Sequence, residues 1–230
     1  MTQFPAPART GTPGRALIIS GGWPGHQPQV FARLIQAMLE SGGLQVTHAD
    51  TLDVLSDPGA LGDLALIVPN WTMGRLSGEQ SRHLRAAVQA GTGLGGFHGG
   101  MGDAFREDTD YQFMVGGQFV AHPGNVRRYR VDLTPVAHPV TAGLDPSFEV
   151  DSEQYYMHTD PTNTVLATTT FDGRDAPWTQ GAVIPAAWVR RYGQGRVFYS
   201  SVGHHPPDFG HPTVAQLHRR GLLWAAGRPA

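Results

Sequence analysis

Residues 95–100 read Gly-Gly-Phe-His-Gly-Gly, and the rest of the sequence is best interpreted outward from them. The stretch follows an apolar segment typical of a buried strand and precedes a segment typical of a short helix. Its core, Gly96-x-His98-x-Gly100, has the layout of a nucleophile elbow, in which small residues let the chain reverse sharply at the end of a strand. Elbows usually carry Ser or Cys at the centre, whereas this one carries an imidazole.

Segments of strand and helix character alternate before this turn. Apolar runs at 15–20, 44–48 and 64–68 and the run before His98 predict parallel strands. Residues 28–41 and 77–89 have the spacing of amphipathic helices, the second beginning with a capping box at Ser77 and Gln80. This rhythm predicts an α/β fold with an open, mostly parallel sheet covered by helices on both sides. Ligands of such sheets bind at the carboxyl ends of the strands, so segments 21–26, 69–72 and 96–100 should converge.

The second half of the sequence has a different character. Residues 118–123 have the composition of a loop. Strands are predicted at 128–133, 148–156, 164–171, 186–192 and 196–202, with the last two forming a hairpin, and a closing helix is predicted at 212–226. No linker divides the chain, so residues 15–230 are expected to form a single domain. Residues 1–14 are expected to be a flexible tail.

The composition excludes several kinds of chemistry. The sequence has no Cys and no Lys, which excludes thiol nucleophiles, thiolate zinc sites, Walker-type phosphate loops and cofactors such as pyridoxal phosphate that need a lysine. Acid–base or metal chemistry must come from the 11 His and from Asp, Glu, Tyr or Arg. The net charge of -2 gives no sign of nucleic-acid binding, and no apolar run is long enough to span a membrane. A cytoplasmic location is expected.

Two interpretations of His98 are open. In the first, the glycines only permit a tight turn and His98 is a hydrogen-bonded structural residue. In the second, the helix N-terminus below the turn offers the N–H groups of Gly99 and Gly100 to an anion or a polarised carbonyl group, and favours a neutral imidazole. Neutral imidazole is the form that acts as a general base or a metal ligand.

Candidate partners of His98 follow other predicted strands. Of the adjacent His204 and His205, only one is expected to face the site, and His204 is favoured. In an alternating strand Asp151, Glu153 and Tyr155 share one face, where a carboxylate and a phenol could perform acid–base chemistry or bind sugar hydroxyls. The alternative is a solvated edge strand.

Further candidates are weaker. His122 and His26 could join a histidine cluster, although each could equally be an ordinary loop residue. Trp71, Trp23 and Tyr155 could supply the aromatic faces on which sugar rings stack, although core packing is the commoner role of Trp. No pair of His has the helical spacing of a zincin, so the spacing alone gives little support to a metal site.

Several motifs together resemble the ThuA-like, or trehalose-utilisation, family. They are Gly96–Gly100, Gly117–Pro123, His138–Leu144, Asp151–Tyr155, Pro185–Tyr199 and Gly203-His204, and the resemblance covers residues 15–227. It implies a three-layer α/β/α, flavodoxin-like fold similar to class I glutamine amidotransferases. In those enzymes the elbow carries a catalytic Cys, a position taken here by His98. His204 approximates their His, Pro206 replaces their Glu, and without Cys the chain is not a glutaminase.

The resemblance also implies a link to sugar catabolism and leaves two hypotheses. The first is an enzyme that acts on a disaccharide or a 3-keto-sugar through His98, Glu153 and His204. Its substrate-binding residues would be His26, Trp71, Gly99, Gly100, Tyr155 and Arg190. A divalent metal such as zinc could be held by His98, His122 and His204. The second is a non-catalytic carbohydrate-binding or regulatory domain. A homo-oligomer that uses the hairpin of the second half is a further expectation.

Overall fold

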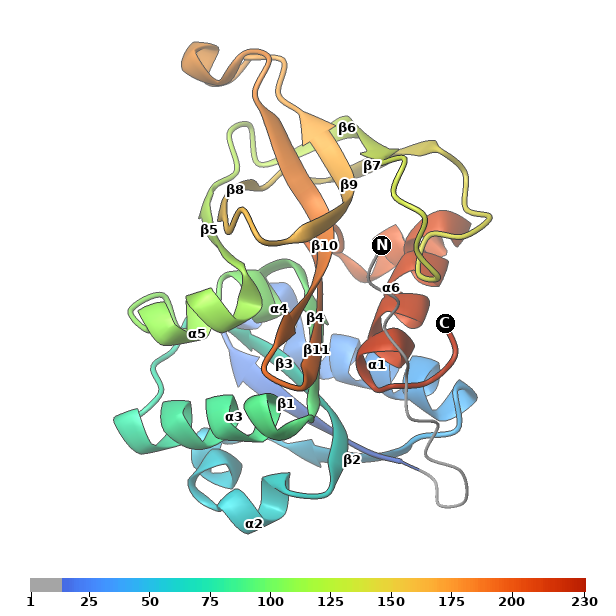
Figure 1. Ribbon diagram of the computed structural model, residues 1–230. Helices are drawn as coiled ribbons and strands as arrows, with labels where there is room; N and C mark the ends of the chain where they lie inside the picture. The colour runs from blue at the N-terminus through green and yellow to red at the C-terminus, as the bar shows by residue number, and fades with distance from the viewer. Residues whose placement is uncertain (1–13) are drawn as a thin grey trace.

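The computed structural model describes residues 14–230, so the tail predicted for residues 1–14 lies, apart from Gly14, outside the described residues. Strands and helices alternate through the first part of the chain (Figure 1). They are β1 (Arg15–Gly22), η1 (Pro24–His26), α1 (Pro28–Ser41), β2 (Gln45–Ala49), η2 (Leu52–Ser56), α2 (Pro58–Leu61), β3 (Leu64–Thr72), α3 (Gly78–Ala90), β4 (Gly93–Phe97) and α4 (His98–Gly102). Helix α3 begins with the predicted capping box between Ser77 and Gln80.

Strands dominate the second part of the chain. Its elements are α5 (Thr109–Val115), β5 (Gly117–Ala121), β6 (Val126–Leu133), β7 (Ser147–Glu153), β8 (Tyr156–Thr159), β9 (Thr164–Thr170), η3 (Pro177–Thr179), β10 (Val183–Tyr192), β11 (Gly195–Ser200), η4 (Pro206–Gly210) and α6 (Pro212–Ala225). The segment predicted as a loop at 118–123 thus begins with strand β5.

The described residues form a nine-stranded central sheet in the order β2-β1-β3-β4-β11-β10-β9-β6-β7. Its pairings from β2 to β11 are parallel, and those from β11 to β7 are antiparallel. The prediction of a mostly parallel sheet is therefore only partly confirmed, because the sheet is mixed. The physical reason lies in the connections, since β10 and β11 are joined by a tight turn and such turns can only link antiparallel strands.

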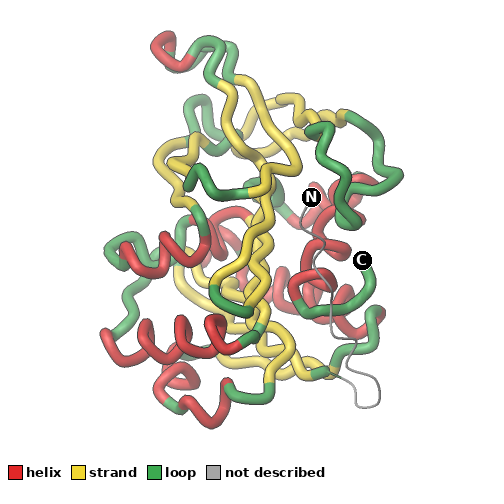
Figure 2. The backbone as a smooth tube through the Cα atoms, in the orientation of Figure 1, coloured by secondary structure: helices red, strands yellow, loops and turns green. Residues whose placement is uncertain are grey.

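Helices cover both faces of the parallel half, as predicted (Figures 1 and 2). Helices α1 and α6 lie on one face, and α2, α3 and α5 lie on the other. Alternate side chains of β1 divide between the two layers, with Ala16 and Ile18 in the core beneath α1 and Leu17 and Ile19 in the opposite core. The α/β class predicted from the sequence is confirmed.

The strand predicted at 148–156 is broken at Gln154. The buried side chain of Gln154 donates a hydrogen bond of 2.7 Å to Oγ1 of Thr169 in β9, and the chain leaves the central sheet after Glu153. Residues Tyr156–Thr159 then pair with β5 in a separate two-stranded sheet. The break places Glu153 at a strand end, where its side chain reaches the site described below.

No helix among residues 14–230 combines the length and the apolar character needed to cross a membrane.

Candidate functional site

The glycine-rich turn joins β4 to α4, with His98 as the first helical residue. The φ of His98 is 45°, in the left-handed region that a non-glycine residue rarely adopts. Close packing requires the glycine that follows, because a Cβ atom on Gly99 would lie 2.4 Å from Cε1 of His26. The hydroxyl of Tyr199 donates a hydrogen bond of 3.1 Å to the carbonyl oxygen of His98. The turn therefore holds the His98 ring in one direction.

Four buried side chains meet at this turn, and we call them the histidine centre: His26 after β1, His98, Glu153 at the end of β7, and His204 after β11. One nitrogen or oxygen atom of each lies within 4.8 Å of the others. The Nε2 atom of His98 lies 3.1 Å from Oε2 of Glu153 and 3.2 Å from Nδ1 of His204. The same carboxylate oxygen lies 3.2 Å from Nδ1 of His204 and 3.9 Å from Nε2 of His26.

In two of the histidines, the ring nitrogen that points away from the centre has a hydrogen-bond partner. Nδ1 of His98 lies 2.8 Å from the carbonyl oxygen of Ser201, and Nδ1 of His26 lies 2.8 Å from Oγ1 of Thr72. Because a carbonyl oxygen only accepts hydrogen bonds, Nδ1 of His98 carries the hydrogen. In the neutral ring, the lone pair of Nε2 then points at Glu153 and His204.

Burial controls the charges of the histidine centre. It lowers the pKa of His98 to about 4 and outweighs the opposing effect of the neighbouring Glu153 carboxylate, so this ring is neutral near pH 7. Burial opposes ionisation of Glu153, but hydrogen bonds from His204 and His26 hold its pKa well below its usual range. The centre therefore combines an ionised carboxylate with at least one neutral imidazole.

These donors fit a divalent metal ion. Ligands about 2.0–2.1 Å from a tetrahedral zinc ion are separated by about 3.3–3.4 Å. Three of the separations above are 3.1–3.2 Å and a fourth is 3.9 Å. The partners at Nδ1 of His98 and His26 resemble the outer hydrogen bonds that orient metal-bound histidines. A cation between the lone pair of His98 and the carboxylate would also remove the repulsion between these two acceptors.

A second layer of contacts connects β7 to the loop that carries His204. The hydroxyl of Ser152 donates a hydrogen bond of 2.7 Å to Oδ2 of Asp208 in η4 and accepts a weaker one, of 3.4 Å, from the backbone N–H of His204. The same oxygen of Asp208 accepts from the backbone N–H of His205, at 3.3 Å. Ser152 precedes Glu153, so this network sets the distance between Glu153 and His204.

Tyr155 and His122 border the centre without belonging to it. The Tyr155 ring stacks on His98 with centroids 4.0 Å apart, and burial raises its pKa well above the usual value, so its hydroxyl remains a donor. Nε2 of His122 lies 3.8 Å from Oε1 of Glu153, the carboxylate oxygen that faces away from His98. The side chain of His122 is 32% exposed, far more than the others. Of the three histidines predicted to hold a metal, the four-residue group contains His98 and His204 and leaves His122 outside, and His26 and Glu153 complete the group.

The remaining candidates have different surroundings. Gly100 lies in the first turn of α4, against Asn70. The Trp71 indole packs closely on the backbone of Gly21 and Gly74. The Arg190 guanidinium pairs with Asp160 at 3.4 Å and lies over the ring of Phe113, and its described contacts include no member of the histidine centre.

Sequence reasoning missed the supporting residues Thr72, Ser152, Ser201 and Asp208. A signal existed for Asp208, because Pro206 and an Asp three residues after His205 are typical of a helix start. Ser201 acts through its backbone carbonyl group, which any residue type would supply. Asp151, expected to share a face with Glu153, is exposed, because the strand alternation breaks where Ser152 and Glu153 are both buried.

The sequence profile of the ThuA family, described as trehalose utilisation, matches residues 15–225. The chain belongs to the ThuA family. This confirms the resemblance found in the sequence. No curated protein matches the chain significantly.

Solved structures share the fold of this ThuA-family chain. A ThuA-like protein from Parabacteroides merdae superposes with a TM-score of 0.75 at 20% identity, covering 94% of this chain and 90% of that one. One from Bacteroides uniformis has a TM-score of 0.77 at 17% identity and covers 96% of both chains. A cytoplasmic protein from Salmonella typhimurium has a TM-score of 0.60 at 14% identity, covering 92% of this chain and 97% of that one.

Proposed function

We propose that this ThuA-family protein is an enzyme that acts on a disaccharide or a 3-keto-sugar derivative at a divalent metal ion, such as zinc, held by the histidine centre. The observation that carries the proposal is the convergence of three imidazoles and one ionised carboxylate on the elbow turn. The family description, trehalose utilisation, supports the substrate class.

Four residues would hold the metal: His26, His98, His204 and, through Oε2, Glu153. A bound divalent ion supplies Lewis-acid polarisation of a sugar carbonyl or hydroxyl group. The Nδ1 contacts of His98 and His26 orient their rings toward this position. The N–H groups of Gly99 and Gly100, in the first turn of α4, would face the negative charge that develops on the substrate oxygen.

Proton transfer is assigned to the outer oxygen of Glu153. A carbonyl group acidifies the neighbouring C–H, and Oε1 of Glu153, which faces His122 rather than His98, can accept that proton. His122 is the exposed neighbour through which the proton passes to solvent, and the protonated Tyr155 hydroxyl can donate to a substrate oxygen. Such an acid–base step contributes about 10²–10⁴-fold to a rate.

Trp23 is the residue best placed to stack on a sugar ring. It is 44% exposed, and its ring stands edge-on to His26 with centroids 4.7 Å apart. Its backbone N–H donates a hydrogen bond of 3.1 Å to the carbonyl oxygen of Thr72, whose hydroxyl contacts His26. The indole is thus held next to a metal ligand with its surface open to solvent.

The scaffold is proposed to be the flavodoxin-like one of class I glutamine amidotransferases, with His98 where those enzymes carry Cys. Without Cys, the chain cannot form the thioester of a glutaminase. We also place the protein in the cytoplasm, as the similar Salmonella protein is described.

The proposal is tested by metal analysis of the purified protein and by turnover of 3-keto-glucosides before and after chelation. We expect about one equivalent of divalent metal, turnover that chelation abolishes and metal restores, and loss of turnover in His98→Ala. An unimpaired turnover rate in that variant would contradict the assignment of His98 to the active site. Saturable sugar binding without turnover, with or without metal, would instead favour the non-catalytic carbohydrate-binding domain.

A further inference from the structure

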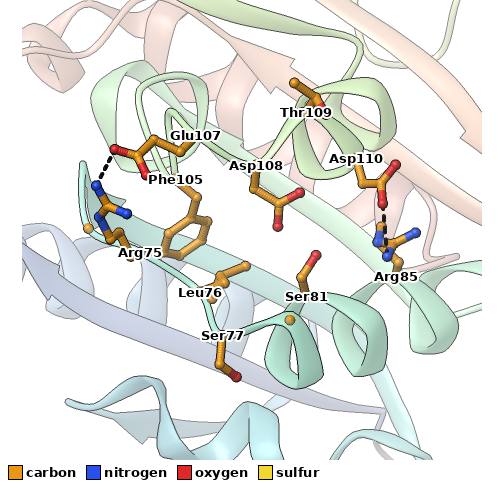
Figure 3. Close-up of a pocket in the computed structure, with 12 residues that line it drawn as sticks. Arg75, Leu76, Ser77, Ser81, Arg85, Phe105, Glu107, Asp108, Thr109 and Asp110 are labelled. Atoms are coloured by element: carbon orange, nitrogen blue, oxygen red, sulfur yellow. Dashed lines mark hydrogen bonds and ion pairs between the residues drawn. The ribbon is translucent and has the colours of Figure 1, made fainter.

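A second candidate site lies away from the histidine centre, in a groove of about 360 Å³ between α3 and the segment that joins α4 to α5 (Figure 3). One wall is formed by residues 74–78 with Ser81 and Arg85, and the other by Phe105 and residues 107–110. None of these residues belongs to the histidine centre. A volume of this size accepts one sugar ring.

Two ion pairs cross the groove, one near each end (Figure 3). Arg75 pairs with Glu107 at one end, and Nη2 of Arg85 lies 3.0 Å from Oδ2 of Asp110 at the other. Apart from Arg85, these side chains are largely exposed, so the pairs add little to stability. They do hold planar charged groups at fixed places on both walls.

Two polar groups on one face of α3 lack partners among the described residues. Ser81 is only 7% exposed, and its backbone N–H bonds to the carbonyl oxygen of Ser77 in the preceding turn. The Ser81 hydroxyl makes no hydrogen bond with the described residues. Nε of Arg85 is buried and also has no partner. The two residues are four positions apart and therefore adjacent on the helix surface. A buried donor without a partner is unfavourable, so a ligand that accepts a hydrogen bond from Nε of Arg85 would be stabilised, and the Ser81 hydroxyl, which lines the groove, can bond to the same ligand.

The charges of the groove select the kind of ligand. The two arginines pair with Glu107 and Asp110, which leaves the Asp108 carboxylate as an acceptor and the Nε–H of Arg85 as a donor, and the remaining negative charge disfavours an anion. Oδ1 of Asp108 accepts from the backbone N–H of Tyr111 at 2.9 Å, and Figure 3 shows the carboxylate directed into the groove. A hydroxyl group can accept from Arg85 and donate to Asp108 at the same time.

We propose that this groove binds a neutral polyhydroxylated ligand, one sugar ring in size, through Ser81, Arg85 and Asp108. The site is separate from the histidine centre and does not depend on the proposed reaction. It would give the protein a second contact with a carbohydrate.

The test follows backbone amide NMR signals of the isotopically labelled full chain during titration with D-glucose. We expect saturable shifts at residues 75–85 and 105–110, with a dissociation constant on the order of a few millimolar for a ligand of this size. Arg85→Lys keeps a positive charge facing Asp110 but lacks the Nε–H, and should weaken binding about tenfold or more. Ser81→Ala should weaken it by about two- to tenfold.

Two controls accompany this titration. His98→Ala, which disables the histidine centre, should leave the affinity of the groove within about twofold because the two sites share no residue. Glucose 6-phosphate should bind at least tenfold more weakly than glucose, by about the effect of one unfavourable charge beside Asp108. The proposal is overturned by an absence of saturable shifts in the groove up to about 100 mM glucose, far above the dissociation constant expected for such a ligand. Unchanged binding in Arg85→Lys, or tighter binding of the phosphate ester, also overturns it.

Discussion

The Nδ1 atom of His98 lies 2.8 Å from the carbonyl oxygen of Ser201, which directly follows the strand next to β4 in the sheet. This contact connects the elbow turn to the neighbouring strand β11 and fixes which nitrogen of His98 carries the hydrogen. The lone pair of Nε2 is thereby directed at Glu153 and His204. A single backbone carbonyl group thus determines which face of the imidazole is available for chemistry.

Gly99→Ala should disrupt the histidine centre from the backbone side. A Cβ atom at this position would lie 2.4 Å from Cε1 of His26, so the His26 ring must move. We expect a loss of stability of about 1–3 kcal/mol from overpacking, together with weaker metal binding. Urea unfolding and metal competition with a chromogenic chelator measure the two effects. Gly210→Ala is the matched control, because nothing lies within 4 Å of its Cβ position. Equal metal affinity in both variants would contradict this account.

Ser152→Ala tests whether the Ser152 hydroxyl positions Glu153 and His204 for metal binding or only stabilises the fold. The change removes the hydroxyl that bonds to Asp208 and to the backbone of His204. We expect metal affinity to fall about tenfold or more, the usual effect of removing an outer hydrogen bond of a metal site. The unfolding free energy of the metal-free protein should fall by about 1–2 kcal/mol. Ser41→Ala removes an exposed serine hydroxyl bonded to Met38 and should leave metal affinity unchanged. A stability loss without any change in metal affinity would show that the network is only structural.

Trp23→Ala should weaken substrate binding and leave metal binding unchanged. An aromatic contact of this kind is worth about 3- to 10-fold in affinity, so KM should rise by that factor while kcat and metal content stay near wild type. Trp178→Ala is the control, because Trp178 is 86% exposed at the turn between β9 and β10 and lies outside the histidine centre. Steady-state kinetics of both variants are the measurement. An unchanged KM in Trp23→Ala would remove this residue from the substrate site.

Acid should destabilise the metal-free protein over a defined range. The pKa of His98 is about 4 in the folded chain because of burial, against 6.5 for an ordinary histidine, and the same holds for the fully buried His218. The unfolded chain therefore binds more protons, so the unfolding free energy should be highest above pH 6.5 and should fall as the pH drops toward 4. Glu153 acts in the same direction once the pH falls below 4.5, the ordinary pKa of a glutamate, because its pKa is also lowered in the folded chain.

Urea unfolding at pH values across this range, with NMR titration of the histidine rings, checks this prediction. Stability that stays constant or rises as the pH falls from 6.5 to 4 would contradict it. Bound metal should sharpen the dependence, because protons compete with the metal for the same nitrogens.

The alternation of strands and helices could be predicted from local patterns. The apolar run at 15–20 and the helical spacing at 28–41 depend on residues close in sequence, and the structure places β1 and α1 there. Apart from the predicted hairpin of β10 and β11, the direction of the later strands could not be predicted this way, because strand composition does not specify which strand becomes the neighbour. The break at Gln154 depends on a hydrogen bond to Thr169, which is distant in sequence.

The sequence by itself determined the chemistry that is available. With no Cys and no Lys, it directed attention to the histidines, and the glycines around His98 identified a turn that presents one side chain. Only the tertiary structure decided the membership of the site. His26 and Glu153 complete the group and His122 stays outside it, because separations of 3–4 Å between atoms from four segments are set by packing and backbone hydrogen bonds rather than by local sequence.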